Sequence, residues 1–357
     1  MEENELKVLV INPGATSTKI SVFEEDKDIL NIKIPHGMEE IGKFEKIIDQ
    51  LPYRMVKMQL ALEDAGAWPL EVDCVIGRGG LVRAVPSGTF EINDRVLEEI
   101  TAAKYGEHAS NLGIPMAKQF SLMNGNIPCY FTNPVSVDEM EEVARVSGYK
   151  GMYRKSLFHA LNHKAAAEKA AEKIGKPYEE TKMIVAHLGG GVSVCAHKDG
   201  KVVDVFNVKD EGAFALDRCG SLPVNDVIKL CYENRHESHK VKFLLGQRGG
   251  VYSYLGTTDL IEIEKMIEDG NEEAALIFEA LAYQLAKDMG AMHCVLLGQT
   301  EAVVLTGGMA NSKKLVERIQ HYAGHLAQFI VLPGEFEMEA MAKNAIKATK
   351  TGVHLEY

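Results

Sequence analysis

Three short apolar stretches separated by turn signals open the chain. Leu6–Ile11 is an unbroken apolar run, and two further apolar segments cover Ile20–Glu24 and Ile29–Ile34. The residues NPG at 12–14 follow the first segment, and three charged residues follow the second. Runs of this length, bounded by glycine, proline and charged residues, are typical of β-strands. We therefore predict that the chain begins with a three-stranded meander.

The same pattern returns in the second half of the chain. Apolar strands are expected at Met183–Ala186, Val192–His197 and Val202–Phe206. The residues HLGGG at 187–191 separate the first two strands, and Asp199-Gly200 forms a hairpin turn before the third. Ser21 and Ser193 also fall at matching places after their glycine turns. This likeness indicates a duplicated unit.

Helical and strand patterns alternate after each meander. In the first half we predict helices at residues 55–65 and 94–105 and strands at 73–76 and 129–132. In the second half we predict helices at residues 271–292 and 312–326 and strands at 302–305 and 329–332. A helix over 156–174 would bridge the halves, and the last helix, from about Phe336, would pack back on the first half. This order predicts an α/β fold with two similar lobes facing each other across a cleft. A single larger α/β sheet with a coincidental hairpin likeness is the alternative.

Composition narrows the class of protein. Of the 357 residues, 46% are hydrophobic and 25% are charged, which is ordinary for a globular chain long enough for two domains. No apolar run reaches eighteen residues and the acidic start lacks the basic opening of a secretory signal, so we expect a cytoplasmic protein with no membrane partner. A formal net charge of −12 argues against non-specific nucleic-acid binding. Six scattered cysteines without a C-x-x-C pair indicate neither a disulfide framework nor a zinc cluster.

Three glycine-containing turns have the composition of phosphate-binding loops. In NPGATSTK, residues 12–19, hydroxyls, backbone N–H groups and Lys19 can converge between two strands, although a hairpin turn is an equally good interpretation. This segment is not a P-loop, because a strand follows it where a helix would be required. The glycines of HLGGG leave the backbone open to a bulky anion. TGGMANS, residues 306–312, ends a buried strand and opens a helix, which suits a nucleotide but also describes a plain β-to-α connection.

Two arginines in glycine turns, Arg78 in GRGG and Arg218 in DRCGS, are candidates to bind an anion. A guanidinium can clamp a carboxylate or spread the charge of a phosphoryl group in transfer, but arginines in surface turns are common. His159 and His163 lie four residues apart in RKSLFHALNH, which is half of a metal site with no evident third ligand. We therefore expect His159 to donate a hydrogen bond to a phosphoryl group and His163 to be structural or exposed.

Carboxylates that could bind Mg²⁺ occur in two segments. Asp138 and Glu139 follow Asn133-Pro134, and Glu335 and Glu337 lie in PGEFEME. A magnesium site needs one or two carboxylates together with water and phosphate oxygens. Acidic residues also favour the positive ends of helices, which explains most of these carboxylates without a metal.

Taken together, the motifs NPGATSTK, IGRGG, EHASNLG, RKSLFHALNH, AHLGGGVSV, DRCGSLP, LTGGMANS and LPGEFEMEA resemble those of the acetate and butyrate kinase family, with a closer fit to its butyrate kinase branch. The resemblance runs through essentially the whole chain. It implies the duplicated, ribonuclease H-like fold of actin-like ATPases, with two lobes around a central cleft. Residues 1–155, with the C-terminal helix 335–357 packed back on them, would form the first lobe, and residues 156–334 would form the second, nucleotide-binding lobe.

The resemblance also implies an activity and roles for particular residues. The activity is reversible transfer of the γ-phosphate of ATP to a short-chain fatty acid, which yields ADP and an acyl phosphate, with Mg²⁺; we also expect a homo-oligomer. The implied catalytic residues are Arg78, His159, Arg218 and His108. The implied nucleotide-binding residues are Asn12, Ser17, Lys19, Gly189, Gly190, Gly191, Gly307, Gly308 and Asn311. The implied metal-binding residues are Asn133, Asp138, Glu335 and Glu337. Arg78 and Phe158 would contact the acid, with Phe158 in the apolar wall around its tail.

This chain departs from the family pattern at a few positions. Where relatives place an aspartate before a Pro-Val segment, this chain has the neutral Asn133, so we expect Asp138 or Glu335 to supply the missing charge. Ala15 and Cys219 replace residues that usually carry a hydroxyl. Spacing does not separate Glu335 from Glu337.

Two other functional classes are compatible with such a fold. An actin-like sugar or polyol kinase would share the fold and the loops, but it would need a catalytic aspartate as a base, for which the sequence offers no clear candidate. A non-metabolic actin-like ATPase, such as a chaperone or filament protein, is the third hypothesis, which we rank last because we expect no further substrate module after Tyr357.

Overall fold

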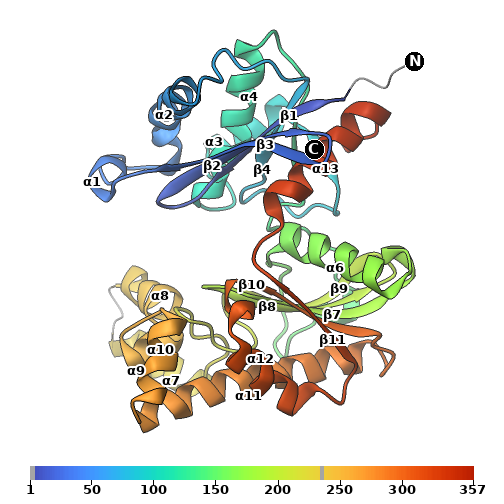
Figure 1. Cartoon of the computed structure of the whole chain (residues 1–357). Helices are drawn as coiled ribbons and strands as arrows, with labels where there is room; N and C mark the ends of the chain where they lie inside the picture. Colours follow the sequence, from blue (N-terminus) through green and yellow to red (C-terminus); the bar gives the residue numbers. More distant parts are fainter. Residues whose placement is uncertain (1–4, 234–236) are drawn as a thin grey trace. The chain divides into compact units, whose positions relative to one another are not determined.

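The chain folds into two compact units in a computed structural model that describes residues 5–233 and 237–357 (Figure 1). The first unit is the chain up to Asp138 together with Phe336–Tyr357, and the second unit is Glu139–Glu335. The sequence places a boundary after residue 155, whereas the structure groups residues 139–155 with the second unit. Glu139 forms an ion pair with Lys164 there, and the Glu141 N–H donates to the carbonyl of Val203.

The sheet of the first unit contains the predicted meander and three further strands. The antiparallel strands are β1 (Lys7–Pro13), β2 (Ser17–Glu24) and β3 (Lys27–Pro35). Strand β4 (Cys74–Arg78) pairs in parallel with β1, and β6 (Cys129–Thr132) pairs in parallel with β4. The short β5 (Thr89–Glu91) closes the edge antiparallel to β6, so the order is β3-β2-β1-β4-β6-β5.

The sheet of the second unit repeats this topology. Its meander consists of β7 (Lys182–Leu188), β8 (Val192–Lys198) and β9 (Lys201–Phe206), and the parallel strands are β10 (Ala302–Gly307) and β11 (Gln328–Pro333). The order β9-β8-β7-β10-β11 matches β3-β2-β1-β4-β6 strand for strand. The predicted duplication is therefore confirmed.

The predicted match between Ser21 and Ser193 is wrong by two residues. Counted from the closed end of each hairpin, Ser21 belongs to the fourth residue pair of β1 and β2, whereas Ser193 belongs to the second pair of β7 and β8. Lys19, which pairs with Asn12, is thus the equivalent of Ser193, which pairs with His187. The pairing of each middle strand with the third strand also shifts register at equivalent places, after Val22 and after Ala196. The two glycine turns differ in length, so a comparison of the two sequences after each turn matched residues that are not equivalent in the structure.

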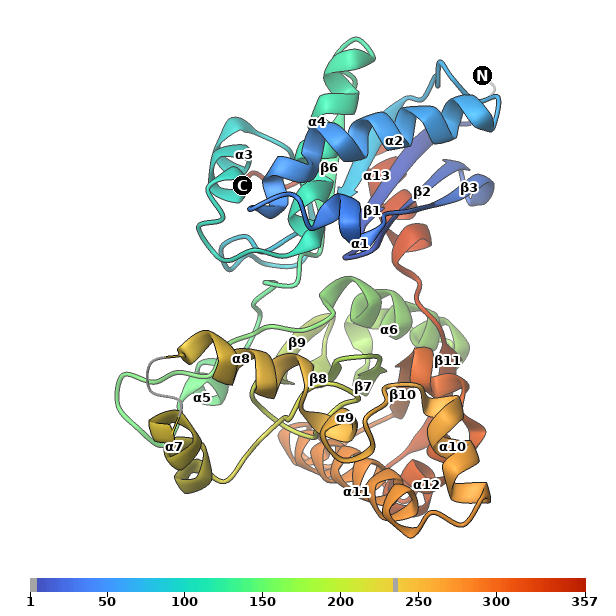
Figure 2. The same ribbon diagram turned by 90° about the vertical axis from the view of Figure 1, so that its left-hand side faces the viewer.

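Helices cover the first sheet on both faces (Figures 1 and 2). They are α1 (Met38–Ile41), α2 (Leu51–Asp64), α3 (Asp94–Thr101), α4 (Gly113–Met123) and α13 (Glu337–Thr351). Helices α2 and α4 bury Met58, Leu62 and Phe120 against Leu9 and Ile11 of β1. Helix α13 packs on β1, β4 and β6 through its own buried face, as the sequence predicts for the last helix.

Both faces of the second sheet are buried; one is apolar, and the other carries polar as well as apolar side chains. Its helices are α5 (Glu142–Arg145), α6 (Ala160–Ile174), α7 (Val224–Glu233), α8 (Ser238–Gln247), α9 (Gly250–Leu255), α10 (Leu260–Glu268), α11 (Glu272–Val295) and α12 (Lys313–Ala323). Helix α11 packs on the apolar face, where Ile184 and Val194 meet Leu285. Because side chains alternate along a strand, His187 and Ser193 point to the other face, which α6 covers.

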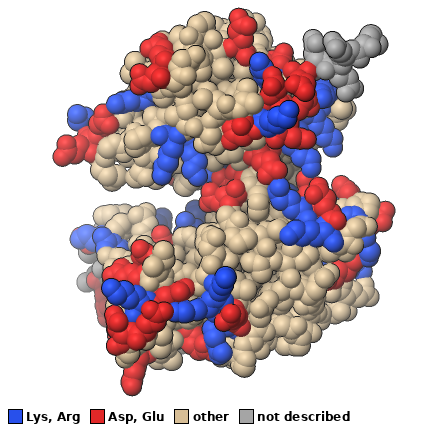
Figure 3. Space-filling view, viewed as in Figure 1, with Lys and Arg blue, Asp and Glu red and all other residues tan. Residues whose placement is uncertain are grey.

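No helix in the described residues combines the length and the apolar composition needed to cross a lipid bilayer. Acidic and basic side chains are interspersed on the face of each unit that Figure 3 shows. The negative net charge is therefore not gathered into a single patch on that face.

Strand β4 and helix α4 approach each other through two glycines. A Cβ atom on Gly77 would lie 2.0 Å from the carbonyl oxygen of Gly113, and one on Gly113 would lie 2.3 Å from the carbonyl oxygen of Arg78. Both neighbours are backbone atoms, which have little freedom to move. This crossing brings the end of β4, and Arg78 with it, close to α4.

We expect Gly77→Ala to lower the free energy of unfolding by about 2–4 kcal/mol, because the added methyl group forces β4 and α4 apart. Gly290→Ala in α11 is the matched control: its Cβ would meet open space, and alanine should stabilise the helix by about 0.5–1 kcal/mol. Urea denaturation followed by circular dichroism measures both changes. Equal unfolding midpoints for Gly77→Ala and the wild type would contradict the close crossing.

Candidate active site

The predicted phosphate loop of the first unit closes the hairpin of β1 and β2. The Gly14 N–H donates to the carbonyl of Ser17 over 2.7 Å and so closes the turn. Asn12 is buried at the end of β1, whereas its pairing partner Lys19 is exposed. The loop therefore presents a cation and hydroxyl groups beside a buried amide.

Sequence reasoning missed the residue that holds this loop in place. Arg54 of α2 is 1% exposed, and its Nη1 donates to the Gly14 carbonyl (2.9 Å) and to Thr18 Oγ1 (3.1 Å). Nη2 donates to the Ala15 carbonyl (3.3 Å), and Gln50 Oε1 accepts from the same guanidinium. Burial lowers the pKa of Arg54 to about 10, which still leaves it charged at neutral pH. Arg54 lies in the first turn of α2 with no motif around it, so the sequence holds no local signal for this role.

Three predicted site residues from distant motifs meet in the first unit. Arg78 Nη2 lies 2.7 Å from Glu337 Oε1, and Arg78 Nη1 donates to Asn12 Oδ1 over 3.2 Å. Asn12 Nδ2 donates to Glu337 Oε2 over 3.0 Å and closes the triangle. Glu337 is 3% exposed at the start of α13, where the Arg78 guanidinium balances its charge and Asn12 donates a hydrogen bond to it. Glu335, which the sequence could not separate from Glu337, belongs to the second unit.

The other predicted residues of the first unit make local contacts. His108 is the N-cap of a short 3-10 helix, and its Nδ1 accepts from the Ser110 N–H over 3.2 Å. Asn133 has a positive φ of 38°, and its Oδ1 accepts from the Gly88 N–H over 2.8 Å. The Asp138 N–H donates to the Val85 carbonyl. The catalytic role of His108 and the metal-binding roles of Asn133 and Asp138 stay predictions.

Two histidines stack beside the glycine loop of the second unit. The rings of His159 and His187 lie 3.9 Å apart with an interplanar angle of 21°. His159 is the N-cap of α6 rather than part of its first turn, and His187 lies near the end of β7. A Cβ atom on Gly189 would lie 2.8 Å from His187 Nε2, so glycine is needed there to make room for the imidazole.

Arg218 lies against the same glycine loop. A Cβ atom on Gly191 would lie 2.3 Å from Arg218 Nη1, and that nitrogen also donates to the Val208 carbonyl over 3.2 Å. Arg218 Nε lies 3.6 Å from Oδ1 of Asp217, whose pKa is raised by burial. The structure thus brings together three predicted features of the second unit, namely the loop 189–191, His159 and Arg218.

The second glycine turn of this unit follows the neighbouring strand. Gly307 ends β10 with a φ of 91°, and a Cβ atom there would lie 2.4 Å from the Leu188 carbonyl oxygen. Asn311 Nδ2 donates to the Gly308 carbonyl, and Ser312 caps α12. Strands β7 and β10 are parallel neighbours, so both glycine turns lie at the same edge of the sheet. Ligands of open α/β sheets bind at this edge.

Phe158 and His163 lie inside the second unit. Phe158 is 1% exposed, and its ring meets that of His163 edge to face at 5.2 Å. A place for Phe158 in a substrate wall stays a prediction. His163 is fully buried, and it lies beside Cys195 and His197, with one ligand atom of each within 4.8 Å of the others. The sequence showed no third partner for a histidine pair because these residues come together only across β8 and α6.

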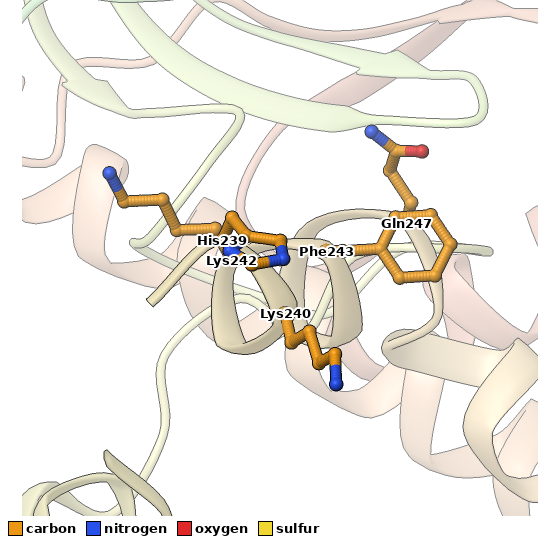
Figure 4. Close-up of a pocket in the computed structure, with 5 residues that line it drawn as sticks. All are labelled: His239, Lys240, Lys242, Phe243 and Gln247. Carbon is orange, nitrogen blue, oxygen red and sulfur yellow. The ribbon is translucent and has the colours of Figure 1, made fainter. Parts of the chain in front are cut away.

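A shallow hollow on α8 contains none of the predicted site residues. It is lined by His239, Lys240, Lys242, Phe243 and Gln247. In Figure 4 the Phe243 ring and the Gln247 amide lie one turn apart along α8, while Lys240 extends away from them. A hollow made by one helix offers few converging polar groups, so it is not a candidate active site.

The segment that carries Arg218 is tethered to the half-buried carboxylate of Asp288. Asp288 of α11 accepts from the Ala213 N–H over 2.6 Å, and a Cβ atom on Gly212 would lie 2.5 Å from the same carboxylate oxygen. Burial raises the pKa of Asp288 to about 6 from an ordinary value of 3.8. The folded protein therefore binds more protons than the unfolded chain between about pH 4 and pH 6.

We expect the free energy of unfolding to fall as the pH rises through this window, because ionised Asp288 is poorly solvated. Asp288→Asn should remove that dependence and be up to about 3 kcal/mol more stable than the wild type above pH 7. Chemical denaturation between pH 4 and pH 8 measures the difference, with the exposed Asp269→Asn as the control. Parallel stability curves for the wild type and Asp288→Asn would contradict this expectation.

Known proteins show the same fold. The family model described as the acetokinase family matches residues 144–342, more than half of the chain. Acetate kinase from Porphyromonas gingivalis is similar in structure, with a TM-score of 0.78 and 22% identity, over 96% of this chain and 99% of that chain. Propionate kinase from Francisella tularensis gives a TM-score of 0.75 and 18% identity, with 96% and 99% coverage. Acetate kinase from Entamoeba histolytica gives 0.74 and 18%, with 94% and 98% coverage.

The structural likeness confirms the predicted duplicated α/β fold of actin-like ATPases. At 18–22% sequence identity this likeness establishes the fold alone, whereas the match to the family model establishes that the chain is related to that family. The chain belongs to the acetokinase family.

Proposed function

We propose that this protein is a kinase that transfers the γ-phosphoryl group of ATP reversibly to a short-chain fatty acid. The products would be ADP and an acyl phosphate. Membership of the acetokinase family and the likeness to acetate and propionate kinases favour a carboxyl group as the acceptor. The motifs quoted above favour butyrate or a branched-chain relative as the acid. The observation that carries the proposal is that Arg218 and His187 lie against the loop 189–191 and that His159 stacks on His187.

The proposed reaction needs no general base. A carboxylate oxygen attacks the γ-phosphorus, and the bond from that phosphorus to the oxygen that bridges it to the β-phosphate breaks, so that ADP leaves. The nucleophile is already an anion, and the difficulty is to bring it against a charged phosphate chain. Fixed cations and hydrogen-bond donors relieve this repulsion and stabilise the charge on the phosphoryl group in transfer.

The second unit offers such donors at the glycine loop. Arg218 supplies a permanent cation that already rests against Gly191. We propose that it and His159 stabilise the transferring phosphoryl group, and that the N–H groups of residues 189–191 bind phosphate oxygens. The turn 307–311, at the same edge of the sheet, would contact the rest of the nucleotide.

The first unit offers a second charged cluster. Glu337 orients the Arg78 guanidinium through their 2.7 Å contact, and we propose that Arg78 binds the carboxylate of the acid. Ser17 and Lys19 would contact phosphate. The carboxylate of Glu337 and the amide oxygen of Asn12 are hard oxygen ligands in one cluster, so the donor set fits Mg²⁺. Bound there, Mg²⁺ would neutralise phosphate charge, and we propose Glu337 rather than Glu335 as its main protein ligand, with Asp138 and Asn133 as further candidates.

An acceptor screen tests the proposal. Purified protein with ATP and Mg²⁺ is offered acids from acetate to valerate together with isobutyrate, and acyl phosphate is trapped by hydroxylamine as a hydroxamate. We expect hydroxamate with at least one acid and the highest kcat/KM with a four-carbon acid. No product with any acid, together with phosphorylation of glycerol or a sugar, would favour the sugar kinase alternative.

Replacement of Arg218 tests the observation on which the proposed function rests. Arg218→Ala should lower kcat about 100- to 1,000-fold, because one charge-stabilising donor to the transition state is lost. Arg248→Ala, which removes an exposed arginine of the same unit, is the matched control and should retain wild-type turnover. Wild-type turnover in Arg218→Ala would remove this residue from the mechanism.

A further inference from the structure

A line of hydrogen bonds runs through the interior of the second unit from Tyr178 to His159. Tyr178 Oη lies 2.7 Å from His197 Nδ1, and His197 Nε2 lies 3.3 Å from His163 Nδ1. His163 Nε2 lies 2.9 Å from Ser193 Oγ. Ser193 Oγ in turn lies 3.0 Å from His159 Nδ1. Each imidazole inside the line uses both of its ring nitrogens.

The interior of this line is shielded from water. His163 and His197 are fully buried, and Ser193 is nearly so. Burial, with a smaller contribution from neighbouring His197, lowers the pKa of His163 well below its ordinary value, and burial also lowers that of His197. Both rings are therefore neutral at neutral pH, and each carries one N–H hydrogen and one lone pair. In each of the four hydrogen bonds between Tyr178 and His159, one group is then the donor and the other is the acceptor.

The contact between His163 and His197 has the geometry of a hydrogen bond between rings. The two rings are nearly coplanar, with an interplanar angle of 6°. Their centroids lie 5.6 Å apart while the facing nitrogens lie 3.3 Å apart, so both nitrogens lie close to the line that joins the ring centres. An N–H on one ring therefore points at the lone pair of the other.

Three orders of donors satisfy all four links, because the Ser193 hydroxyl can accept two hydrogen bonds. In the first, the Tyr178 O–H donates to His197 Nδ1 and each group donates to the next, so that all three histidines carry hydrogen on Nε2 and Ser193 donates to His159 Nδ1. In the reverse order all three carry hydrogen on Nδ1. The phenolic hydrogen would then need another acceptor, and the bond to His197 is the hydrogen bond that the structure gives Tyr178 Oη within the described residues. In the third order Ser193 Oγ accepts from both His163 Nε2 and His159 Nδ1, and its own hydrogen is left without an acceptor among the hydrogen bonds that the structure gives Ser193 Oγ within the described residues. A buried donor without an acceptor is unfavourable, so the first order is preferred.

We propose that Tyr178, His197, His163 and Ser193 are positioning residues that hold His159 with its hydrogen on Nε2. Since Nδ1 accepts from Ser193, Nε2 can only donate. This inference rests on the proposed function in one respect, namely that His159 Nε2–H is the donor to the transferring phosphoryl group. The opposite tautomer would turn a lone pair toward that anion and repel it.

The stacked partner of His159 has the same polarity. Asn162 Nδ2 donates to His187 Nδ1 over 2.8 Å, which leaves the hydrogen of a neutral His187 ring on Nε2. The two stacked rings thus both accept at Nδ1, His159 from Ser193 of β8 and His187 from Asn162 of α6.

A metal ion is the other interpretation of the group formed by His163, Cys195 and His197. The geometry disfavours it, because Cys195 Sγ lies 4.0 Å from His163 Nε2 whereas His197 contacts His163 Nδ1. The two residues therefore approach opposite sides of the same ring, and a single ion can bind only one of its nitrogens. The lone pairs of a metal site would also converge on a point away from the line between the rings.

The tautomers can be measured directly. Protein labelled with ¹⁵N-histidine is examined at pH 8 by two-bond ¹H–¹⁵N correlation, and signals are assigned with His159→Gln, His163→Gln and His197→Gln. We expect hydrogen on Nε2 in all three rings. Hydrogen on Nδ1 in any of them, a doubly protonated ring, or a stoichiometric metal ion in the purified protein would overturn the proposal.

Tyr178→Phe removes only the phenolic oxygen and its hydrogen, and it tests whether Tyr178 sets the order of hydrogen-bond donors. Without the phenolic hydrogen the first order and the reverse order become similar in free energy, so the Nδ1–H form should become detectable in all three histidines, a shift of about tenfold in their tautomer ratio. Turnover should fall about three- to tenfold with KM for both substrates nearly unchanged. Tyr322→Phe, which removes a hydroxyl bonded to Glu279 in the same unit, should alter neither. Unchanged tautomers in Tyr178→Phe would overturn the proposal.

The positioning residues should also affect turnover through a single line of hydrogen bonds. Ser193→Ala breaks the last link, so the double variant Ser193→Ala/Tyr178→Phe should turn over no slower than Ser193→Ala alone. Additive losses would contradict a single path. The tautomer spectra do not depend on turnover, so they decide the hydrogen-bond order even if no acid is phosphorylated, and a failed spectrum leaves the proposed function intact.

Discussion

The structure of the second unit depends on hydrogen bonds to polar side chains that are buried on one face of its sheet. Along β7 and β8 every second side chain joins the apolar core under α11, and the residues between them face α6. Three of these, His187, Ser193 and His197, are polar and nearly or fully buried. Buried polar groups are costly unless paired, so each side chain must find partners in α6, and this requirement fixes the ring of His159 at the start of that helix.

Duplication explains why charged and polar residues occur at equivalent places in both units. Asn12 and His187 hold equivalent positions near the ends of β1 and β7. In each unit a helix begins beside that residue, since Glu337 opens α13 next to Asn12, and His159 caps α6 next to His187. One copy thereby holds a carboxylate and a guanidinium, whereas the other holds imidazoles and an arginine. A single topology has thus been adapted to two kinds of chemistry.

Local patterns predicted the two meanders and the main crossover elements, because each depends on neighbouring residues. Helix α4 was missed because Gly113 and Pro115 near its start are typical of turns. Helices α7–α10 lie in a segment for which no elements were predicted, although α7 and α10 are amphipathic. The role of Arg54 and the line from Tyr178 to His159 arise from contacts between distant segments, which no local pattern encodes. The motifs placed Arg78, Glu337, His159 and Arg218 among the candidates. Only the structure shows that Glu337, and not Glu335, contacts Arg78 in the first unit.

The central claim is that a carboxyl group is the phosphoryl acceptor, and the reverse reaction tests it most directly. Purified protein is incubated with ADP, Mg²⁺ and acetyl, propionyl or butyryl phosphate, and ³¹P NMR follows the nucleotide. The account predicts that ATP appears as the acyl phosphate disappears, at a rate that requires the protein. Acyl phosphates that persist in the presence of active, folded protein, with no ATP formed from any of them, would contradict it.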